Sequence, residues 1–180
     1  MTYTPLDSEA RELQISAALS ALRRNGLNIS IPESFSASLK ATTLFDGNDG
    51  LFKELLGSSK IYGEYGCGKS TEFALKYTDA SICSVDTSEE WACKIRSVAQ
   101  RMNSERLNLK WVDVGLIGDW GYPVSFTHRH KYVEYAEYIW GKSDPDLVLI
   151  DGRFRVYCFL TSLKFSAVGT KLLFDDYVDR

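Results

Sequence analysis

The sequence predicts an α/β fold built on a doubly wound parallel sheet with helices on both faces. From residue 58 onward, short strand-like segments alternate with segments whose apolar residues recur at helical spacing. A repeated strand, helix, strand order favours parallel pairing through right-handed crossovers. Carboxylates end four of the five strand candidates, and the carboxyl ends of parallel strands share one edge of a sheet, where ligands bind: Glu64, Asp86, Asp151 and Asp175.

The individual elements follow from local patterns. Short runs rich in β-branched, aromatic or leucine residues predict strands at 60–64, 81–86, 109–114, 147–151 and 171–175. Helices are expected at 69–77, 88–102, 132–140 and 154–165. No internal repeat or low-complexity segment competes with this order.

Two further helices are expected before the first strand. Residues 7–25 are rich in Ala, Leu, Glu and Arg, and they end in two arginines followed shortly by Gly26, as helix C-termini often do. Residues 50–56 follow Asp49, a candidate N-cap, and precede Gly57, a candidate stop. We therefore expect a helical extension over residues 1–57 and a sheet domain over residues 58–180.

Composition excludes several classes of protein. The 180 residues are 44% hydrophobic, which is enough to bury a core and argues against disorder. A net charge of -3 lacks the basic excess of a dedicated nucleic-acid binder. No apolar run approaches the ~20 residues that span a bilayer, and no secretion signal opens the chain. We expect a cytoplasmic protein that acts on a small molecule, without nucleic-acid or membrane partners.

The cysteines are expected to be free thiols. They lie far apart in the sequence, and no C-x-x-C pair with a nearby histidine offers a zinc site. Their spacing does not suggest a disulfide framework either. The four residues are Cys67, Cys83, Cys93 and Cys158.

The glycine-rich segment GEYGCGKS, which begins at Gly63, fits two different cofactor patterns. One is the P-loop pattern G-x-x-x-x-G-K-[ST], in which backbone amides cradle phosphates, Lys69 reaches the terminal phosphate and Ser70 holds magnesium. That pattern predicts a nucleotide kinase or hydrolase. The other is an acidic-x-G-x-G pattern, in which the strand runs through Gly63 to Glu64 and the glycines let a cofactor lie against the backbone.

Neighbouring residues favour the second pattern. Only two apolar residues, Ile61 and Tyr62, stand before Gly63, where a P-loop needs a good hydrophobic strand. Asp86 ends the next strand, eighteen residues after Gly68. That is where dinucleotide-binding folds place the acidic residue that holds the ribose hydroxyls. Asp151, in the segment LVLIDG, could still serve as the magnesium-side carboxylate of a P-loop enzyme, so both patterns stay open.

EYGCGKS followed by SICSVD resembles the first two motifs of class I S-adenosylmethionine-dependent methyltransferases. The resemblance covers residues 58–180 and implies a Rossmann-like sheet with strand order 3-2-1-4-5. It implies that the glycine loop passes the methionine part of the cofactor, that the second strand ends at the ribose, and that the third ends at the adenine. The cofactor-binding residues so implied are Glu64, Gly66, Cys67, Gly68, Asp86, Thr87 and Asp113.

The distal part is similar to macrocin-type sugar O-methyltransferases, in which an I-D-G and a D-D-Y segment bind a divalent metal. Here they are residues 150–152 and 175–177, which implies a magnesium site at Asp151, Asp175 and Asp176. Asp151 would also be a candidate general base. Arg153 and Arg155 follow directly. They suit an anionic acceptor such as a phosphorylated or nucleotide-linked sugar, or alternatively they neutralise the nearby aspartates.

Other candidates lie in the connection between the third and fourth strands. His128 and His130 are candidate general bases, because histidine is the residue type that takes up and releases protons near neutral pH. Trp120 and Tyr122 could form an aromatic wall for a substrate ring. Trp91, five residues after Asp86, could cover the cofactor or pack in the core.

The predicted function is methyl transfer from S-adenosylmethionine to a hydroxyl of a sugar or other small metabolite. The alternatives are a P-loop enzyme and a cofactor-binding domain without turnover. The chain ends five residues after Asp175, where class I methyltransferases usually add a sixth and a seventh strand. We expect these two strands to be lacking, which leaves an open sheet edge. That edge, or the N-terminal helix, is the expected homodimer contact.

Overall fold

The computed structural model describes residues 44–45, 49–118 and 122–175. The expected helix at 7–25, and the candidate residues Trp120 and Asp176, lie outside these described residues.

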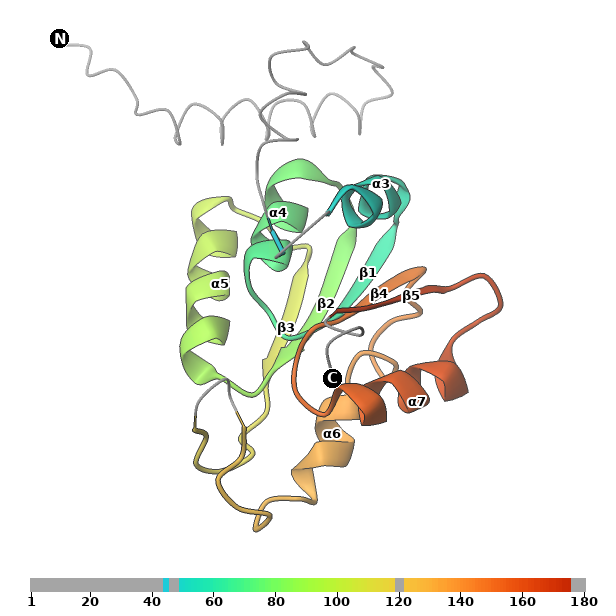
Figure 1. Cartoon of the computed structure of the whole chain (residues 1–180). Helices are drawn as coiled ribbons and strands as arrows, with labels where there is room; N and C mark the ends of the chain where they lie inside the picture. Colours follow the sequence, from blue (N-terminus) through green and yellow to red (C-terminus); the bar gives the residue numbers. More distant parts are fainter. Residues whose placement is uncertain (1–43, 46–48, 119–121, 176–180) are drawn as a thin grey trace, which may run out of the picture.

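Five parallel strands form one sheet in the order β3-β2-β1-β4-β5, which confirms the predicted fold class and strand order (Figure 1). The strands are β1 Ile61–Tyr65, β2 Ser81–Asp86, β3 Leu107–Trp111, β4 Leu147–Ile150 and β5 Lys171–Phe174. The connection direction reverses at β1, which pairs with β2 on one side and β4 on the other. Ligands bind at such a reversal in open α/β sheets.

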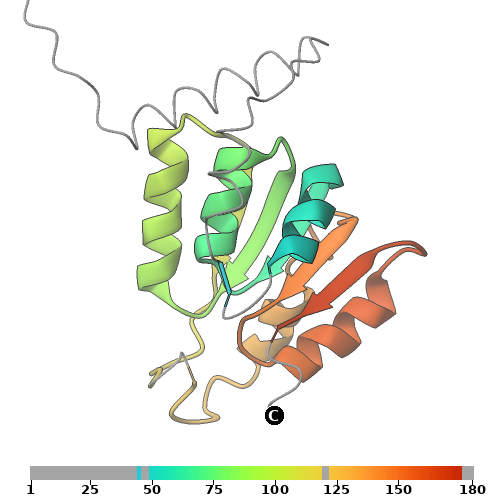
Figure 2. The ribbon, with the colours of Figure 1, turned by 45° about the horizontal axis from the view of Figure 1, so that its top comes forward.

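Helices cover both faces of the sheet. The helices are α3 Gly50–Ser58, α4 Lys69–Tyr77, α5 Glu89–Arg101, α6 Lys131–Glu137 and α7 Arg155–Phe165. Figures 1 and 2 show α3, α4 and α5 on one face and α6 and α7 on the other.

Strand alternation divides the core into two layers. Tyr62 and Leu149 point toward α3, α4 and α5, whereas Tyr65 and Ile150 point toward α6 and α7. Phe52 of α3 packs in the first layer beside Tyr62, with ring centroids 5.8 Å apart. Side-chain direction within each strand therefore decides which helices a residue meets.

The third strand differs from the prediction, because it covers Leu107–Trp111 instead of 109–114. β3 is an edge strand, so its polar residues can meet partners beyond the sheet. The Tyr138 hydroxyl donates to the Asn108 side chain at 2.5 Å, and the Lys110 ammonium lies 2.5 Å from Glu134. These partners come from α6 and its end, so local pattern could not reveal them.

Helix α3 also differs from its prediction. Asp49 stands at the N-cap, but its carboxylate accepts from the Leu44 amide at 2.8 Å and makes no capping bond to the helix. The helix continues through Gly57 to Ser58, and Ser59 ends it in an extended conformation. Gly57 has open space around it and does not stop the helix.

Two other expectations concern membranes and thiols. None of the helices in the described part of the chain combines the length and apolarity needed to cross a bilayer. All four cysteines are free, as expected; three are buried, and Cys93 is exposed on α5.

Candidate functional site

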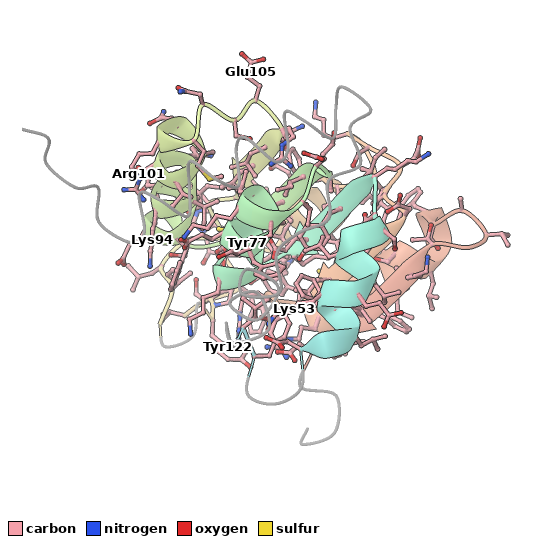
Figure 3. All side chains as sticks on the ribbon, turned by 90° about the horizontal axis from the view of Figure 1, so that it is seen from above. Lys53, Tyr77, Lys94, Arg101, Glu105 and Tyr122 are labelled. Carbon is pink, nitrogen blue, oxygen red and sulfur yellow. The ribbon has the colours of Figure 1, made fainter. Side chains whose placement is uncertain are left out.

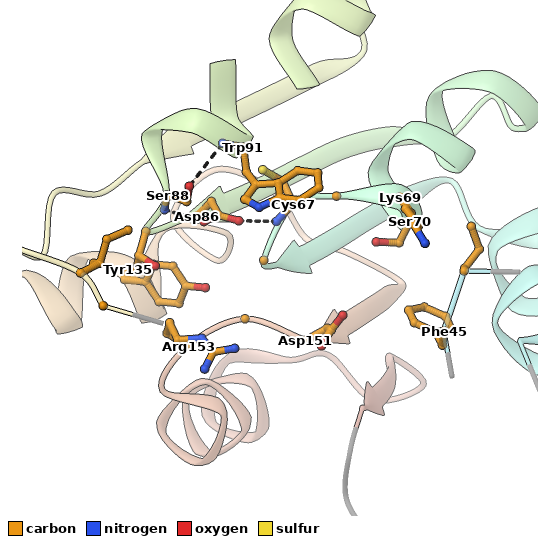
Figure 4. Close-up of a pocket in the computed structure, with 17 residues that line it drawn as sticks. Phe45, Cys67, Lys69, Ser70, Asp86, Ser88, Trp91, Tyr135, Asp151 and Arg153 are labelled. Carbon is orange, nitrogen blue, oxygen red and sulfur yellow. Dashed lines mark hydrogen bonds between the residues drawn. The ribbon is translucent and has the colours of Figure 1, made fainter. Parts of the chain in front are cut away.

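A cavity of about 650 Å³ lies at the carboxyl edge of the sheet, where the strand order reverses (Figure 4). Its floor comes from the loop after β1 and from the ends of β2 and β4. Helices α5 and α6 contribute Trp91 and Tyr135. The remaining lining residues are Lys69 and Ser70 at the start of α4, and Leu44, Phe45, Ile117 and Gly118.

The loop after β1 is tightly packed at Gly66. Its φ of 89° is a conformation that residues with a side chain rarely adopt, and a Cβ there would lie 2.7 Å from the Gly152 Cα. Gly68, by contrast, has nothing within 4 Å of the position that a Cβ would take. The loop therefore presents bare backbone to the cavity and approaches the end of β4 closely.

Asp86, the last residue of β2, ties this loop to the start of α5. Its carboxylate accepts hydrogen bonds from the Cys67 amide at 2.7 Å and from the Ser88 amide at 2.6 Å (Figure 4). It is 8% exposed, and burial raises its pKa. A carboxylate offers about four acceptor positions, so about two remain for ligand hydroxyls. Thr87 also lines the cavity.

Glu64 lies elsewhere than the family motif implies. It shares the sheet face of Tyr62, so it points under the N-terminus of α4 and does not line the cavity. Tyr62 donates to it at 2.8 Å and Ser84 at 3.1 Å, and the hydroxyls of Ser70 and Thr71 donate as well. Complete burial raises its pKa to about 7 against these four donors, which lower it. Glu64 positions the loop and helix α4 and has no direct contact with the cavity.

The same geometry excludes the P-loop interpretation. Gly63 is part of β1, so only three residues separate the strand from α4. Ser70 lines the cavity, but its hydroxyl is engaged as a donor to the buried Glu64 carboxylate, whereas a P-loop serine would hold magnesium. The segment leaves too little loop to surround a phosphate with backbone amides.

The two arginines after β4 have different roles. The Arg155 guanidinium lies 3.2 Å from the Asp151 carboxylate and donates to the backbone oxygens of Gly152 at 3.2 Å and Asp175 at 2.8 Å. Arg153 lies instead over the Tyr122 ring, with its guanidinium carbon 4.6 Å from the centroid. Arg155 therefore neutralises Asp151, while Arg153 lines the cavity at its border.

Asp151 lines the cavity beside this ion pair. Burial, together with the nearby charge of Asp175, raises its pKa to about 7, and the Arg155 charge opposes that rise. The described residues contain no group of three side chains that could hold a metal, and Asp176 lies outside them. The implied magnesium does not fit the residues that are described here, because an arginine already provides the cation beside Asp151.

Three other predicted residues do not reach the cavity. Asp113 follows the end of β3 by two residues, is exposed, and accepts from the Gly115 amide at 2.9 Å. His128 packs against Gly115, and His130 stands exposed at the start of α6. Neither histidine lines the cavity. The connection after β3 contributes Ile117 and Gly118 to the cavity instead of Asp113.

Tyr135 is a cavity residue that the sequence did not single out. Its ring is fully buried, and its hydroxyl lies beside the Arg153 backbone without a regular hydrogen bond. In Figure 4 the hydroxyl points into the space between the Asp86 side and Arg153. Its helical spacing is that of an ordinary core residue, so no local signal distinguishes it.

Comparison with known proteins agrees with this architecture. No protein-family model and no curated protein matches the chain. Among crystal structures, it is similar to a methyltransferase-like protein from Silicibacter pomeroyi, with 31% identity and a TM-score of 0.64 over 85% of this chain and 75% of that one. A putative O-methyltransferase from Klebsiella pneumoniae has 17% identity and a TM-score of 0.50, over 94% of this chain and 66% of that one. An O-methyltransferase from Bacillus cereus, solved in complex with SAH, has 18% identity and a TM-score of 0.49, over 96% and 68%.

Sheet order and the cavity at the strand reversal thus define the class as a Rossmann-like methyltransferase fold. The identity to the Silicibacter protein, over most of both chains, shows the family as well. The chain belongs to the class I S-adenosylmethionine-dependent methyltransferases.

Proposed function

We propose that this protein binds S-adenosylmethionine in the 650 Å³ cavity and transfers its methyl group to a hydroxyl of a small molecule, a sugar or another metabolite. The observation that carries the proposal is Asp86, which ends β2 at the strand reversal and is hydrogen-bonded to the glycine loop. Family membership supports the same chemistry.

The cavity suits a cationic nucleoside. The free acceptor positions of Asp86 fit the two ribose hydroxyls, and the backbone at Gly66 and Gly68 allows a ligand to lie against the loop. Trp91 lines the cavity and is 42% exposed, so its ring offers an aromatic wall. The lining carries the acidic groups Asp86 and Asp151 and the basic groups Lys69 and Arg153; because Arg155 neutralises Asp151, Asp86 is the acid that would favour a positively charged sulfonium.

The bound cofactor would supply an electrophilic methyl carbon, to which the acceptor oxygen forms a C–O bond while the C–S bond breaks and its electron pair stays on sulfur. The protein's own part is to hold the acceptor in line and to accept its hydroxyl proton. Asp151 is the proposed base, because it lines the cavity and its pKa of about 7 suits proton transfer near neutral pH. Arg153 stands at the border of the cavity, where an anionic group of the acceptor could bind it.

Calorimetric titration of the full chain tests the cofactor assignment. We expect binding of S-adenosylmethionine and of S-adenosylhomocysteine, and none of ATP with magnesium. Asp86→Asn should weaken S-adenosylhomocysteine binding at least tenfold, because the amide loses acceptor positions for the ribose and for the Cys67 and Ser88 amides. Asp113→Asn makes the same chemical change on an exposed residue outside the cavity and should leave the affinity unchanged.

Thermal unfolding of both variants shows whether they fold. Binding of ATP without binding of S-adenosylmethionine would overturn the proposed function. Equal losses of affinity in the folded Asp86→Asn and Asp113→Asn variants would show that Asp86 does not hold the ribose.

A further inference from the structure

A second cavity, of about 540 Å³, lies next to the first and shares Gly152 and Arg153 with it. Its size is that of a small-molecule site. Five of its ten lining residues are aromatic: Tyr122, Tyr132, Phe154, Tyr157 and Phe174.

One residue of this aromatic lining, Phe154, has an unusual backbone conformation. Phe154 has φ 55° and ψ 34°, the left-handed region that residues other than glycine, asparagine and aspartate rarely occupy. Its ring stacks on Tyr132 with centroids 4.1 Å apart and meets the Tyr135 ring edge-on at 5.7 Å. Strained residues of this kind persist where the surrounding packing imposes them, and they cluster at ligand sites.

Arg153 is the cation available to a ligand in this cavity. Arg155 also lines it, but the nitrogens of Arg155 are engaged by Asp151, Gly152 and Asp175. No described acidic side chain forms an ion pair with Arg153, which is half-buried and lies over the Tyr122 ring. A guanidinium can bind a carboxylate in a bidentate manner through its N–H groups.

The cavity has one further buried polar group, the hydroxyl of Tyr132. The Tyr132 hydroxyl is buried and has no hydrogen-bond partner among the described residues. Apart from the two arginines, the polar side-chain atoms that line the cavity are tyrosine hydroxyls. A sugar would bring several hydroxyls that this aromatic lining cannot satisfy, and each unpaired group carries a desolvation cost.

We infer that the second cavity binds the methyl acceptor and that the acceptor is a flat aromatic hydroxy acid, whose ring lies among these aromatic side chains and whose carboxylate meets Arg153. This inference rests on the proposed function and narrows its acceptor. The phenol oxygen forms the bond to the methyl carbon, the C–S bond breaks with its electron pair left on sulfur, and the phenolic proton passes to Asp151. Phenols are more acidic than sugar hydroxyls, which suits a carboxylate base.

Calorimetry on the full chain saturated with S-adenosylhomocysteine tests this inference. The probes are 3-hydroxybenzoate, whose hydroxyl and carboxylate lie on the same half of the ring, its amide 3-hydroxybenzamide, which has the same shape without the charge, and glucose 6-phosphate. We expect the acid to bind at least tenfold more tightly than the amide, and glucose 6-phosphate not to bind at the same concentrations. Arg153→Gln should weaken binding of the acid about tenfold and leave binding of the amide unchanged.

Two further variants make the result specific. Arg101→Gln removes an exposed charge at the end of α5, outside both cavities, and should have no effect (Figure 3). Val156→Trp fills the second cavity from a residue that is 69% exposed, so the chain should fold, bind S-adenosylhomocysteine normally and lose binding of the acid.

The outcomes separate the two proposals. If S-adenosylhomocysteine binds but the acid does not, or if acid and amide bind equally, the aromatic-acid inference is overturned while the proposed function stands. Binding of glucose 6-phosphate that Arg153→Gln abolishes would also overturn it, in favour of a sugar phosphate. If S-adenosylhomocysteine itself does not bind the wild-type chain, the proposed function fails.

Discussion

Replacing Glu64 by glutamine should remove a strong pH dependence of stability. Glu64 is fully buried within β1, and its pKa rises from 4.5 to about 7 on folding. The folded state therefore binds the proton more tightly than the unfolded chain does. As the pH rises from 4.5 through 7, the unfolded chain loses this proton first, and the free energy of unfolding falls.

The size of the effect follows from the two pKa values. Each unit of difference corresponds to about 1.4 kcal/mol. Between pH 5 and pH 8, the titration of Glu64 should lower the free energy of unfolding by about 2 to 3 kcal/mol. Glutamine resembles the protonated acid but does not titrate, so Glu64→Gln should become more stable relative to wild type by about that amount over the same range.

Urea unfolding at pH 5, 6.5 and 8, followed by circular dichroism, measures this difference. Asp86 and Asp151 also have raised pKa values, but they are present in both proteins and largely cancel in the comparison. Glu105→Gln makes the same substitution on an exposed loop residue and controls for loss of a surface charge (Figure 3). A wild-type to Glu64→Gln difference that stays constant with pH would show that the four surrounding hydroxyls keep Glu64 ionised throughout.

Two further predictions concern the strand ends. In Gly152→Ala, the new Cβ would lie 2.2 Å from the buried Tyr135 hydroxyl and 2.8 Å from the Gly66 nitrogen. The variant should lose about 2 kcal/mol in urea unfolding, whereas Gly57→Ala, in a helix with open space, should gain about 0.5 to 1 kcal/mol; equal effects would contradict the packing argument. If Asp151 is the base, kcat/KM should rise with pH up to about 7 and then level off. Asp151→Asn should lose about 100-fold in kcat while still binding S-adenosylhomocysteine, and a flat profile of the wild type between pH 6 and 8 would exclude this role.

Much of the fold could be predicted because its patterns are local. Helix α4 and strand β2 have the predicted bounds, since their apolar spacing and flanking residues are unambiguous. Asp86 could also be placed, because a strand end fixes where its carboxylate stands. Strand β3 could not be bounded correctly, because Asn108 and Lys110 find their partners on another element.

The roles of the site residues depended on three-dimensional context. Arg153 and Arg155 are the same residue type two positions apart, yet only Arg155 contacts the Asp151 carboxylate and the Asp175 backbone oxygen. Tyr135 reaches the cavity from α6, far from any motif. The two histidines belong to the long connection after β3, which was a candidate for the acceptor site. In the structure neither of them lines the cavity at the strand ends.

The sequence by itself determined the order of elements, the parallel sheet and the carboxylates Asp86, Asp151 and Asp175 at its strand ends, because hydrophobic periodicity, helix caps and turns depend on a few neighbouring residues. Strand β1 runs one residue further than predicted, to Tyr65, so Glu64 lies within it. Only the tertiary structure decided which carboxylate faces the ligand. Strand alternation places Glu64 under α4, while Asp86 and Asp151, at the ends of their strands, face the cavity. A shift of one residue along a strand reverses a side chain's direction, and the packing of helices on the sheet sets that register.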